Sequence, residues 1–309
     1  MNRNIAIGVD VGGSHITSAA VDLRTLSIMP GTMCSNRVDN KADLKDVFED
    51  WSKAINQTIA SVPQLEELCI GFAMPGPFHY KTGLAMFTGN DKYESLYNIS
   101  IPAEFTAFIK GVHTPELRFL NDATAFGVGV ATTKELKDRS KIITLTLGTG
   151  FGSAFIEDGV PKVKSEQVPK GGYLWDEPFK KGIGDDYFST RWFVKRYNEL
   201  SSKEVCEVKA IAEAGDDSAT IVFQEFAMNM VEFMIPFLEK FHPQTIVLGG
   251  NISKAHKLFL PALKASVQKS GLNIEFKISN LTEGAAILGS AKLFRPEFWN
   301  QVKEDLPNL

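Results

Sequence analysis

Two segments of the sequence share one pattern, in which a run rich in β-branched residues leads through glycines into a second such run. They are IAIGVDVGGSHITSAAV (5–21) and IITLTLGTGFGSAFIEDG (142–159), and aligning them places Gly12 on Gly148. Two such runs joined by glycines are typical of a β-hairpin. The distance between the two segments is too long for the repeat of a solenoid. We therefore expect two similar domains, each opening with a glycine-tipped hairpin.

The length agrees with this expectation, because 309 residues correspond to about two domains at roughly 150 residues each. The apolar and charged fractions, 44% and 23%, are those of an ordinary globular protein. Lys and Arg number 33 against 37 Asp and Glu, which gives a net charge of −4. The chain has no basic footprint, so neither nucleic acid nor a membrane surface is expected as a partner.

The cysteines and the first residues of the chain bear on the compartment. Cys34, Cys69 and Cys206 are few and far apart, so they form neither a disulfide framework nor a CxxC zinc pair. The N-terminal segment is too short and polar for a signal peptide, and no apolar run of eighteen residues follows. We expect a cytoplasmic protein.

Helix-period and strand-period segments alternate along the chain, which indicates an α/β protein. Helices are expected at 43–61, 220–241 and 284–294, strands at 67–77 and 245–251, and a strand leading into a helix at 119–131. Residues 160–185 show no period and are expected to form a long loop.

The first glycine segment, Asp10-Val-Gly12-Gly13-Ser14, suits a polyanion. Glycine lets backbone N–H groups approach phosphates closely, and the Asp10 carboxylate would then need a cation such as Mg²⁺ beside them. A plain tight turn is the alternative.

The second glycine segment, Gly148-Thr149-Gly150-Phe-Gly152, offers a threonine hydroxyl as well. It leads into a strand rather than a helix, which disfavours a dinucleotide fingerprint, and neither segment has the Walker A pattern.

Asn121-Asp122 stands where a predicted strand passes into a helix. Asp122 either caps that helix or serves as a general base for a hydroxyl group, with Asn121 binding another hydroxyl of the same polyol. Such a base, with positioning and charge neutralisation, is most of what phosphoryl transfer requires.

Gly249-Gly250-Asn251 follows a buried strand. The glycines would let a flat base or a ribose lie against the backbone. Alternatively, Asn251 or Ser253 caps the helix that follows.

The order of these motifs resembles that of the ROK family of sugar kinases and sugar-binding regulators. IGVDVGGSHITSAAVD, GFAMPGP, LNDATAFGVG, LTLGTGFGSAFIEDG and IVLGGNIS carry the likeness, from about residue 5 to residue 294. The resemblance implies two actin-like (ribonuclease H-like) α/β domains around a central cleft, built from 1–119 plus 284–309 and from 120–283. It also implies hinges near 120 and 282, and transfer of the γ-phosphate of ATP, with Mg²⁺, to a hexose hydroxyl, usually that on C6.

The resemblance also implies a role for each matching residue. Asp122 is the catalytic base, and Asn121 and Asn90 bind the sugar. Asp10 holds Mg²⁺ directly or through water. The phosphates lie on Asp10, Gly12, Gly13 and Ser14 and on Gly148, Thr149 and Gly150, and the adenosine lies by Gly249, Gly250 and Asn251.

Residues 165–193 depart from the family pattern. They lack the family's Gly-Glu-x-Gly-His segment and contain neither His nor Cys, so no structural zinc is expected. Asp185 takes the place of a sugar-binding glutamate. Trp175, Asp176 and Glu177 either replace the lost sugar contacts or form a solvated acidic loop.

Three functions remain to be weighed. An ATP-dependent hexose kinase for a glucose-like sugar, working as a homodimer, is the first. A catalytically weak sugar or nucleotide binder is the second, which the retained Asp122 disfavours. A polyphosphate-dependent glucokinase is the third. A transcription regulator of the family would carry a DNA-binding module before the first phosphate segment. Because that segment here begins at residue 5, a regulator is not expected.

Overall fold

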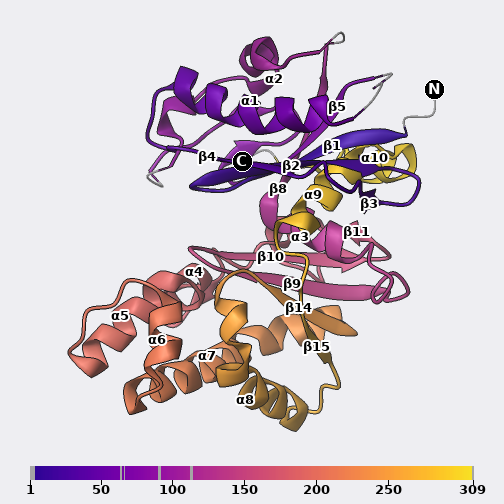
Figure 1. Ribbon diagram of the computed structural model, residues 1–309. Helices are drawn as coiled ribbons and strands as arrows, with labels where there is room; N and C mark the ends of the chain where they lie inside the picture. Colours follow the sequence, from indigo (N-terminus) through magenta and orange to yellow (C-terminus); the bar gives the residue numbers. More distant parts are fainter. Residues whose placement is uncertain (1–3, 63–64, 66, 90–91, 112–113, 308–309) are drawn as a thin grey trace. The chain divides into compact units, whose positions relative to one another are not determined.

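The computed structural model describes residues 4–62, 65, 67–89, 92–111 and 114–307 (Figure 1). The chain forms two compact units, called unit 1 (1–136 with 283–309) and unit 2 (137–282). The sequence predicts a domain boundary after residue 119, whereas the chain passes from unit 1 into unit 2 after residue 136. The reason is that helix α3 (Asp122–Val130) packs on helix α9 (Glu283–Ala291) and so belongs to unit 1.

Unit 1 is built on a mixed sheet in the strand order β3-β2-β1-β5-β8, with β4 pairing to β2. β1 runs antiparallel to β2 and parallel to β5, and β5 runs parallel to β8. The strands are β1 (Ile5–Val11), β2 (His15–Asp22), β3 (Ser27–Ile28), β4 (Cys34–Arg37), β5 (Cys69–Met74) and β8 (Glu116–Asn121). A separate small hairpin joins β6 (Phe78–His79) to β7 (Leu84–Ala85).

Unit 2 repeats this plan in the order β11-β10-β9-β14-β15, with the same pattern of directions. Its strands are β9 (Lys141–Leu147), β10 (Phe151–Glu157), β11 (Val160–Pro161), β14 (Thr245–Gly249) and β15 (Glu275–Ile278). The alignment that places Gly12 on Gly148 also places both ends of β1 on those of β9. The predicted pair of similar α/β domains is confirmed.

Helix α1 (Leu44–Ala60) covers the sheet of unit 1. It begins at Asp43, whose carboxylate accepts the Asp46 backbone N–H at 3.0 Å. Its buried stripe includes Phe48 and Trp51, both fully buried, as the helical spacing predicted. Unit 1 also contains, among its described residues, the short α-helices α2 (Ile101–Glu104) and α10 (Pro296–Val302).

Helices α3 and α9 cross at very short range because glycines stand at the crossing. A Cβ atom built on Gly129 would lie 1.8 Å from the Ala285 carbonyl oxygen, and one built on Gly289 would lie 1.9 Å from that of Ala125. Gly8 of β1 likewise meets the backbone of α9. The small-residue composition of α9 therefore reflects close backbone packing on both α3 and the sheet.

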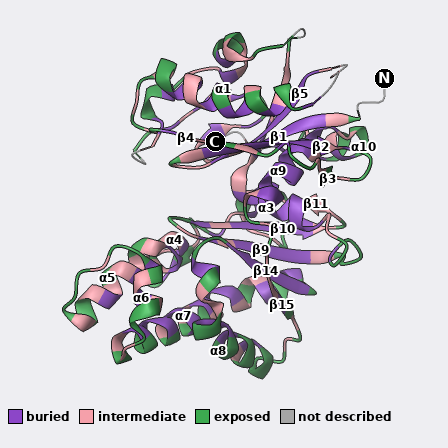
Figure 2. Ribbon diagram, in the orientation of Figure 1, coloured by how far each residue is buried: buried purple, intermediate pink, exposed green. Residues whose placement is uncertain are grey.

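Unit 2 packs its helices on the sheet around a core rich in phenylalanine. Figure 2 shows buried residues along its strands and on parts of its helices. They are α4 (Gly184–Phe188), α5 (Thr190–Ser201), α6 (Val208–Ala214), α7 (Asp217–Phe241) and α8 (His256–Lys269). By length and apolar composition α7 would pass as a membrane span. Its buried side chains, including Phe223, Phe226 and Met230, belong to the core of unit 2, which accounts for its apolar character.

The segment 160–185, predicted to be a long loop, contains short regular elements. It contains β11, a short helical turn at Lys170–Gly172, and a hairpin of β12 (Pro178–Phe179) and β13 (Gly182–Ile183). Leu174 and Phe179 enter the core of unit 2, which anchors the segment. Their isolated apolar positions gave no period to detect.

Candidate active site

The first glycine hairpin joins β1 to β2 in unit 1, and two side chains from elsewhere in the unit donate hydrogen bonds to its carbonyl groups. The Tyr93 hydroxyl donates to the Gly12 oxygen at 2.6 Å, and the Asn40 side-chain amide donates to the Gly13 oxygen. Within the described residues, the backbone N–H groups of Gly13 and Ser14 have no hydrogen-bond acceptor. The hairpin therefore presents N–H groups, as an anion site requires.

The second glycine hairpin, in unit 2, follows the same plan. The Gly148 oxygen accepts the Thr190 backbone N–H at 2.8 Å and the Thr190 hydroxyl at 2.9 Å. The Thr149 oxygen accepts a hydrogen bond from Arg191 Nη1 at 3.1 Å. In the part of the chain that the structure describes, the N–H groups of Thr149 and Gly150 stay without an acceptor. In both glycine segments, therefore, side chains from elsewhere in the same unit bond the carbonyl groups of the turn.

The third glycine segment lies at the base of the second hairpin. Gly249 ends β14 and pairs with Thr146 of β9. Gly250 has a positive φ of 82°, and a Cβ there would lie 2.3 Å from the Leu147 carbonyl oxygen, so only glycine fits. Asn251 precedes a short helical turn without capping it through its side chain. Residues 148–150 and 249–251, which the sequence predicts to bind ATP, therefore lie at the same end of the sheet of unit 2.

Asp122 is the first residue of α3, but it does not cap the helix. Asn121 caps it instead, because its Oδ1 accepts the Thr124 backbone N–H at 3.1 Å. Asp122 Oδ1 accepts the Ala123 N–H at 2.8 Å and the Asn121 side-chain amide at 3.0 Å. One carboxylate oxygen is fixed by these bonds, and no hydrogen bond to the other is found among the described residues.

Asn121 itself is fully engaged. Besides capping the helix and donating to Asp122, its amide donates to the Tyr80 hydroxyl at 3.2 Å. The Tyr80 hydroxyl in turn donates to the Met74 carbonyl oxygen at 3.0 Å. This chain of bonds orients the Asp122 carboxylate from the end of β5.

Acidic side chains come together in unit 1. Burial, reinforced by the negative charges of Asp122 and Glu283, raises the pKa of Asp10 to about 8. Burial also raises the pKa of Asp122, although hydrogen bonding from Ala123 and the positive charge of Lys92 oppose the shift. Lys92 lies over the first hairpin, since a Cβ on Gly13 would be 3.3 Å from its Nζ.

These clustered carboxyl groups suit a divalent cation, which would favour their ionised form. Among the described residues, no three His, Cys, Asp or Glu side chains converge closely enough to hold a metal by themselves. A magnesium ion bound here would take Asp10 as its protein ligand, with water and donor phosphate oxygens completing its shell, as is usual for Mg²⁺. The residues present fit such an ion.

Glu283, at the start of α9, joins this group to β2. Its carboxylate bonds His15 Nε2 and the Thr17 hydroxyl, each at 2.7 Å. The return of the chain into unit 1 is thereby fastened beside the first hairpin.

The other residues predicted to contact the sugar are Asn90, Asp185 and the segment 175–177. Asn90 lies outside the described residues. Asp185 lies in α4 of unit 2, where its carboxylate accepts the Phe151 backbone N–H at 2.7 Å and pairs with Arg191. Trp175 is 46% exposed, and its carbonyl oxygen accepts the Asp185 backbone N–H at 2.9 Å. Burial raises the pKa of Glu177.

Sequence reasoning missed the residues that hold the two hairpins, namely Asn40, Tyr93, Thr190 and Arg191. Each acts through a bond to a backbone carbonyl group, for which no local motif exists. Only the order of the chain could have hinted at Thr190 and Arg191, which closely follow Asp185.

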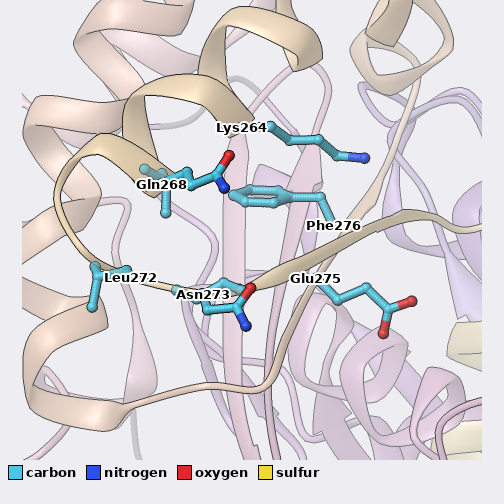
Figure 3. Close-up of a pocket in the computed structure, with 8 residues that line it drawn as sticks. Lys264, Gln268, Leu272, Asn273, Glu275 and Phe276 are labelled. Atoms are coloured by element: carbon cyan, nitrogen blue, oxygen red, sulfur yellow. The ribbon is translucent and has the colours of Figure 1, made fainter.

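A hollow of about 330 Å³ lies elsewhere, between the end of α8 and β15 (Figure 3). Lys264, Gln268 and Phe276 are among its lining residues. None of the predicted site residues lines it, and it contains no arrangement suited to phosphoryl transfer.

Comparison with known proteins shows the family of the chain. The sequence profile of the ROK family matches residues 6–172 and 177–297. The chain belongs to the ROK family. The match includes both glycine hairpins, Asn121-Asp122 and Gly249-Gly250-Asn251.

Among its ROK relatives, the chain is similar to an N-acetyl-D-glucosamine kinase from Haemophilus influenzae. The two are 25% identical over 318 residues, covering 93% of this chain and 98% of the relative. A glucokinase from Thermotoga maritima is 24% identical over 320 residues, covering 94% and 96%. The structure of a ROK family glucokinase from Streptomyces griseus, in complex with glucose and AMPPNP, superposes with a TM-score of 0.69 at 20% identity, covering 94% and 98%. This structural likeness supports the fold of two actin-like domains.

Proposed function

We propose that this protein is an ATP-dependent kinase of a hexose, with Asp122 as the general base. The observation that carries the proposal is that Asn121, and not Asp122, caps helix α3. Because Asn121 caps α3, the Asp122 carboxylate is held by two hydrogen bonds without being needed for the cap. A carboxylate that is oriented but not consumed by structure suits a base.

The reaction assigns each group a task. Asp122 takes the proton of the sugar hydroxyl, whose oxygen forms a bond to the γ-phosphorus of ATP while the bond to the β-phosphate oxygen breaks and ADP leaves. The N–H groups of Gly13, Ser14, Thr149 and Gly150 bind phosphate oxygens, and Gly249, Gly250 and Asn251 border the adenosine. Mg²⁺, when bound by Asp10, neutralises charge on the phosphates.

The sugar is proposed to be glucose-like and to react at its C6 hydroxyl. The relatives named as N-acetyl-D-glucosamine kinase and glucokinase support this class. Asn121, Asn90 and Asp185 remain the proposed sugar contacts. Asn121 and Asp185 would each have to bind the sugar in addition to the bonds described above.

A spectrophotometric assay of ADP release tests the proposal. Glucose, mannose, N-acetylglucosamine and N-acetylmannosamine are offered with ATP and Mg²⁺, and Asp122→Asn serves as the blank. Parallel reactions replace ATP with polyphosphate and measure the sugar phosphate directly. Turnover of at least one sugar with ATP supports the kinase, and turnover with polyphosphate alone supports the alternative donor. Sugar or nucleotide binding without turnover means a catalytically weak binder.

Two further properties belong to the proposal. A cytoplasmic location fits a kinase that uses ATP, and a homodimer is the expected assembly. Light scattering of the purified protein distinguishes about 34 from about 68 kDa, since one chain has a mass of 34.1 kDa.

A further inference from the structure

Lys92 lies over the first glycine hairpin without belonging to any glycine or phosphate motif. A Cβ atom built on Gly13 would lie 3.3 Å from both Cε and Nζ of Lys92. Because a Cβ atom is about 2.5 Å from the backbone nitrogen of its own residue, Nζ lies within about 6 Å of the Gly13 nitrogen. The ammonium group is therefore beside one of the N–H groups that the hairpin leaves open.

The backbone that carries Lys92 is fixed to the same hairpin through the next residue, Tyr93. The Tyr93 N–H donates to the Asn40 carbonyl oxygen at 2.7 Å, and its hydroxyl donates to the Gly12 oxygen at 2.6 Å. The Tyr93 side chain is fully buried. Asn40 in turn donates from its side chain to the Gly13 oxygen. The base of the Lys92 side chain is therefore held at a set distance from the hairpin.

The open N–H groups of Gly13 and Ser14 point away from the side chains that bond the carbonyl groups of this turn, because C=O and N–H have opposite directions in a trans peptide. Lys92 approaches Gly13 on the face where a side chain would stand. Two hydrogen bonds of about 2.9 Å, made to different oxygens of one phosphate, span more than the separation of the two nitrogens. One phosphate group can therefore accept from both the Gly13 N–H and Nζ of Lys92.

Lys92 is also within electrostatic reach of Asp122, the proposed base. Burial raises the pKa of Asp122, and the positive charge of Lys92 opposes this shift. In the proposed reaction the base holds the accepting hydroxyl group and the hairpin holds donor oxygens, so the migrating phosphoryl group passes between them. An ammonium group close to both can neutralise the charge of that group.

We propose that the ammonium group of Lys92 binds the phosphoryl group that is transferred. The proposal rests on the proposed function and adds to it a side chain that contacts the reacting group. The competing interpretation is that Lys92 only offsets the nearby negative charges and so keeps Asp122 ionised. That role acts through the protonation state of the base alone, so a pH profile separates the two.

The kcat of Lys92→Met above the acid limb provides the test. There Asp122 is ionised with or without Lys92, so a lysine that acted only on the base would be dispensable. The plateau value of kcat should stay at least about 10-fold below that of the wild type, the range of one charge-assisted hydrogen bond. A plateau within about 2-fold of the wild type would overturn the proposal.

Two further variants complete this series. Lys92→Arg keeps the positive charge and should recover part of the loss. Lys134→Met removes an exposed lysine of unit 1 and should match the wild type. Thermal melting confirms that each variant is folded.

Nucleotide binding without turnover gives an independent reading. Isothermal titration calorimetry with Mg²⁺ compares ADP with a non-hydrolysable ATP analogue, which differs by the third phosphate. Lys92→Met should weaken binding of the analogue by at least about 5-fold and of ADP by less than about 2-fold. Equal losses for the two nucleotides, or no loss for either, would overturn the proposal. If the wild type binds the analogue but phosphorylates no sugar, the kinase proposal fails, while this comparison still decides whether Lys92 contacts the third phosphate.

Discussion

The Asn121 side-chain amide donates a hydrogen bond to the Asp122 carboxylate at 3.0 Å, while the other end of the same amide caps helix α3. One residue therefore supplies the helix with its start and holds the proposed base. The Tyr80 hydroxyl, which accepts a second bond from that amide, extends the support to the end of β5.

Replacing the proposed base should affect turnover and not sugar binding. Asp122→Asn removes the proton acceptor but keeps the size of the side chain, so kcat should fall by at least about 100-fold. The sugar dissociation constant, measured by calorimetry, should stay within a few-fold. Asp138→Asn, which alters an exposed carboxylate of unit 2, should leave both quantities unchanged. Weak sugar binding with normal turnover per bound sugar would argue against Asp122 as the base.

Removing the positive charge of Lys92 should shift the acid limb of the pH profile. The base must be ionised, so activity is lost as the pH falls through the pKa of Asp122. The positive charge of Lys92 lowers that pKa, which burial raises. Lys92→Met should therefore move the acid limb of kcat/KM upward by about 0.5–1 pH unit. Lys134→Met, an exposed lysine of unit 1, is the control; an unmoved limb in Lys92→Met would separate Lys92 from Asp122.

Asp10 should make the protein without magnesium and nucleotide less stable as the pH rises. Its folded pKa of about 8 lies above the ordinary value of 3.8, so the folded state holds the proton more tightly. The stability from this proton is complete below about pH 4 and is lost as the pH rises through about 8. The Asp10→Asn variant has no such proton to lose. Its melting temperature minus that of the wild type should therefore increase by at least about 3 °C from pH 5 to pH 9.

A constant difference in melting temperature over this range would mean that the pKa of Asp10 is not shifted. Glu283→Gln gives a second check, because Glu283 is one of the two acids that raise the pKa of Asp10. The wild-type loss of stability at high pH should become smaller in this variant. Both series omit Mg²⁺, which would favour the ionised form.

The crossing of α3 and α9 should not tolerate a methyl group. A Cβ on Gly129 or on Gly289 would lie 1.8 or 1.9 Å from a backbone oxygen, so the helices must separate. Gly129→Ala and Gly289→Ala should each lower the free energy of unfolding by about 3 kcal/mol or more. Gly148→Ala, whose Cβ would meet no atom within 4 Å, is the matched control for urea denaturation and should change stability by less than about 1 kcal/mol. Equal costs at Gly129 and Gly148 would contradict the close crossing.

Features with a local signal could be predicted from the sequence. The two hairpins, their shared pattern and the strand before Gly249 follow from β-branched runs interrupted by glycines. The division between the units could not, since α3 joins unit 1 through contacts with α9, and the whole of unit 2 separates these two helices along the chain. Likewise, Asn40 and Tyr93 bond to backbone oxygens across turns, and their own neighbourhoods carry no sign of it.

The helix cap shows the same limit at the scale of one residue. The sequence left open whether Asp122 caps α3 or acts as a base, because Asn and Asp are equally good caps. The backbone path that makes Asn121 the cap depends on how β8 ends against β5, which no local pattern reports.

A crystal structure of the protein with its sugar substrate and a non-hydrolysable ATP analogue tests the central claim most directly. The account predicts a carboxylate oxygen of Asp122 about 2.6–3.2 Å from the sugar hydroxyl that receives the phosphate. It would be contradicted by a bound sugar whose hydroxyl groups all lie beyond reach of Asp122, with that carboxylate bonded only to its own helix.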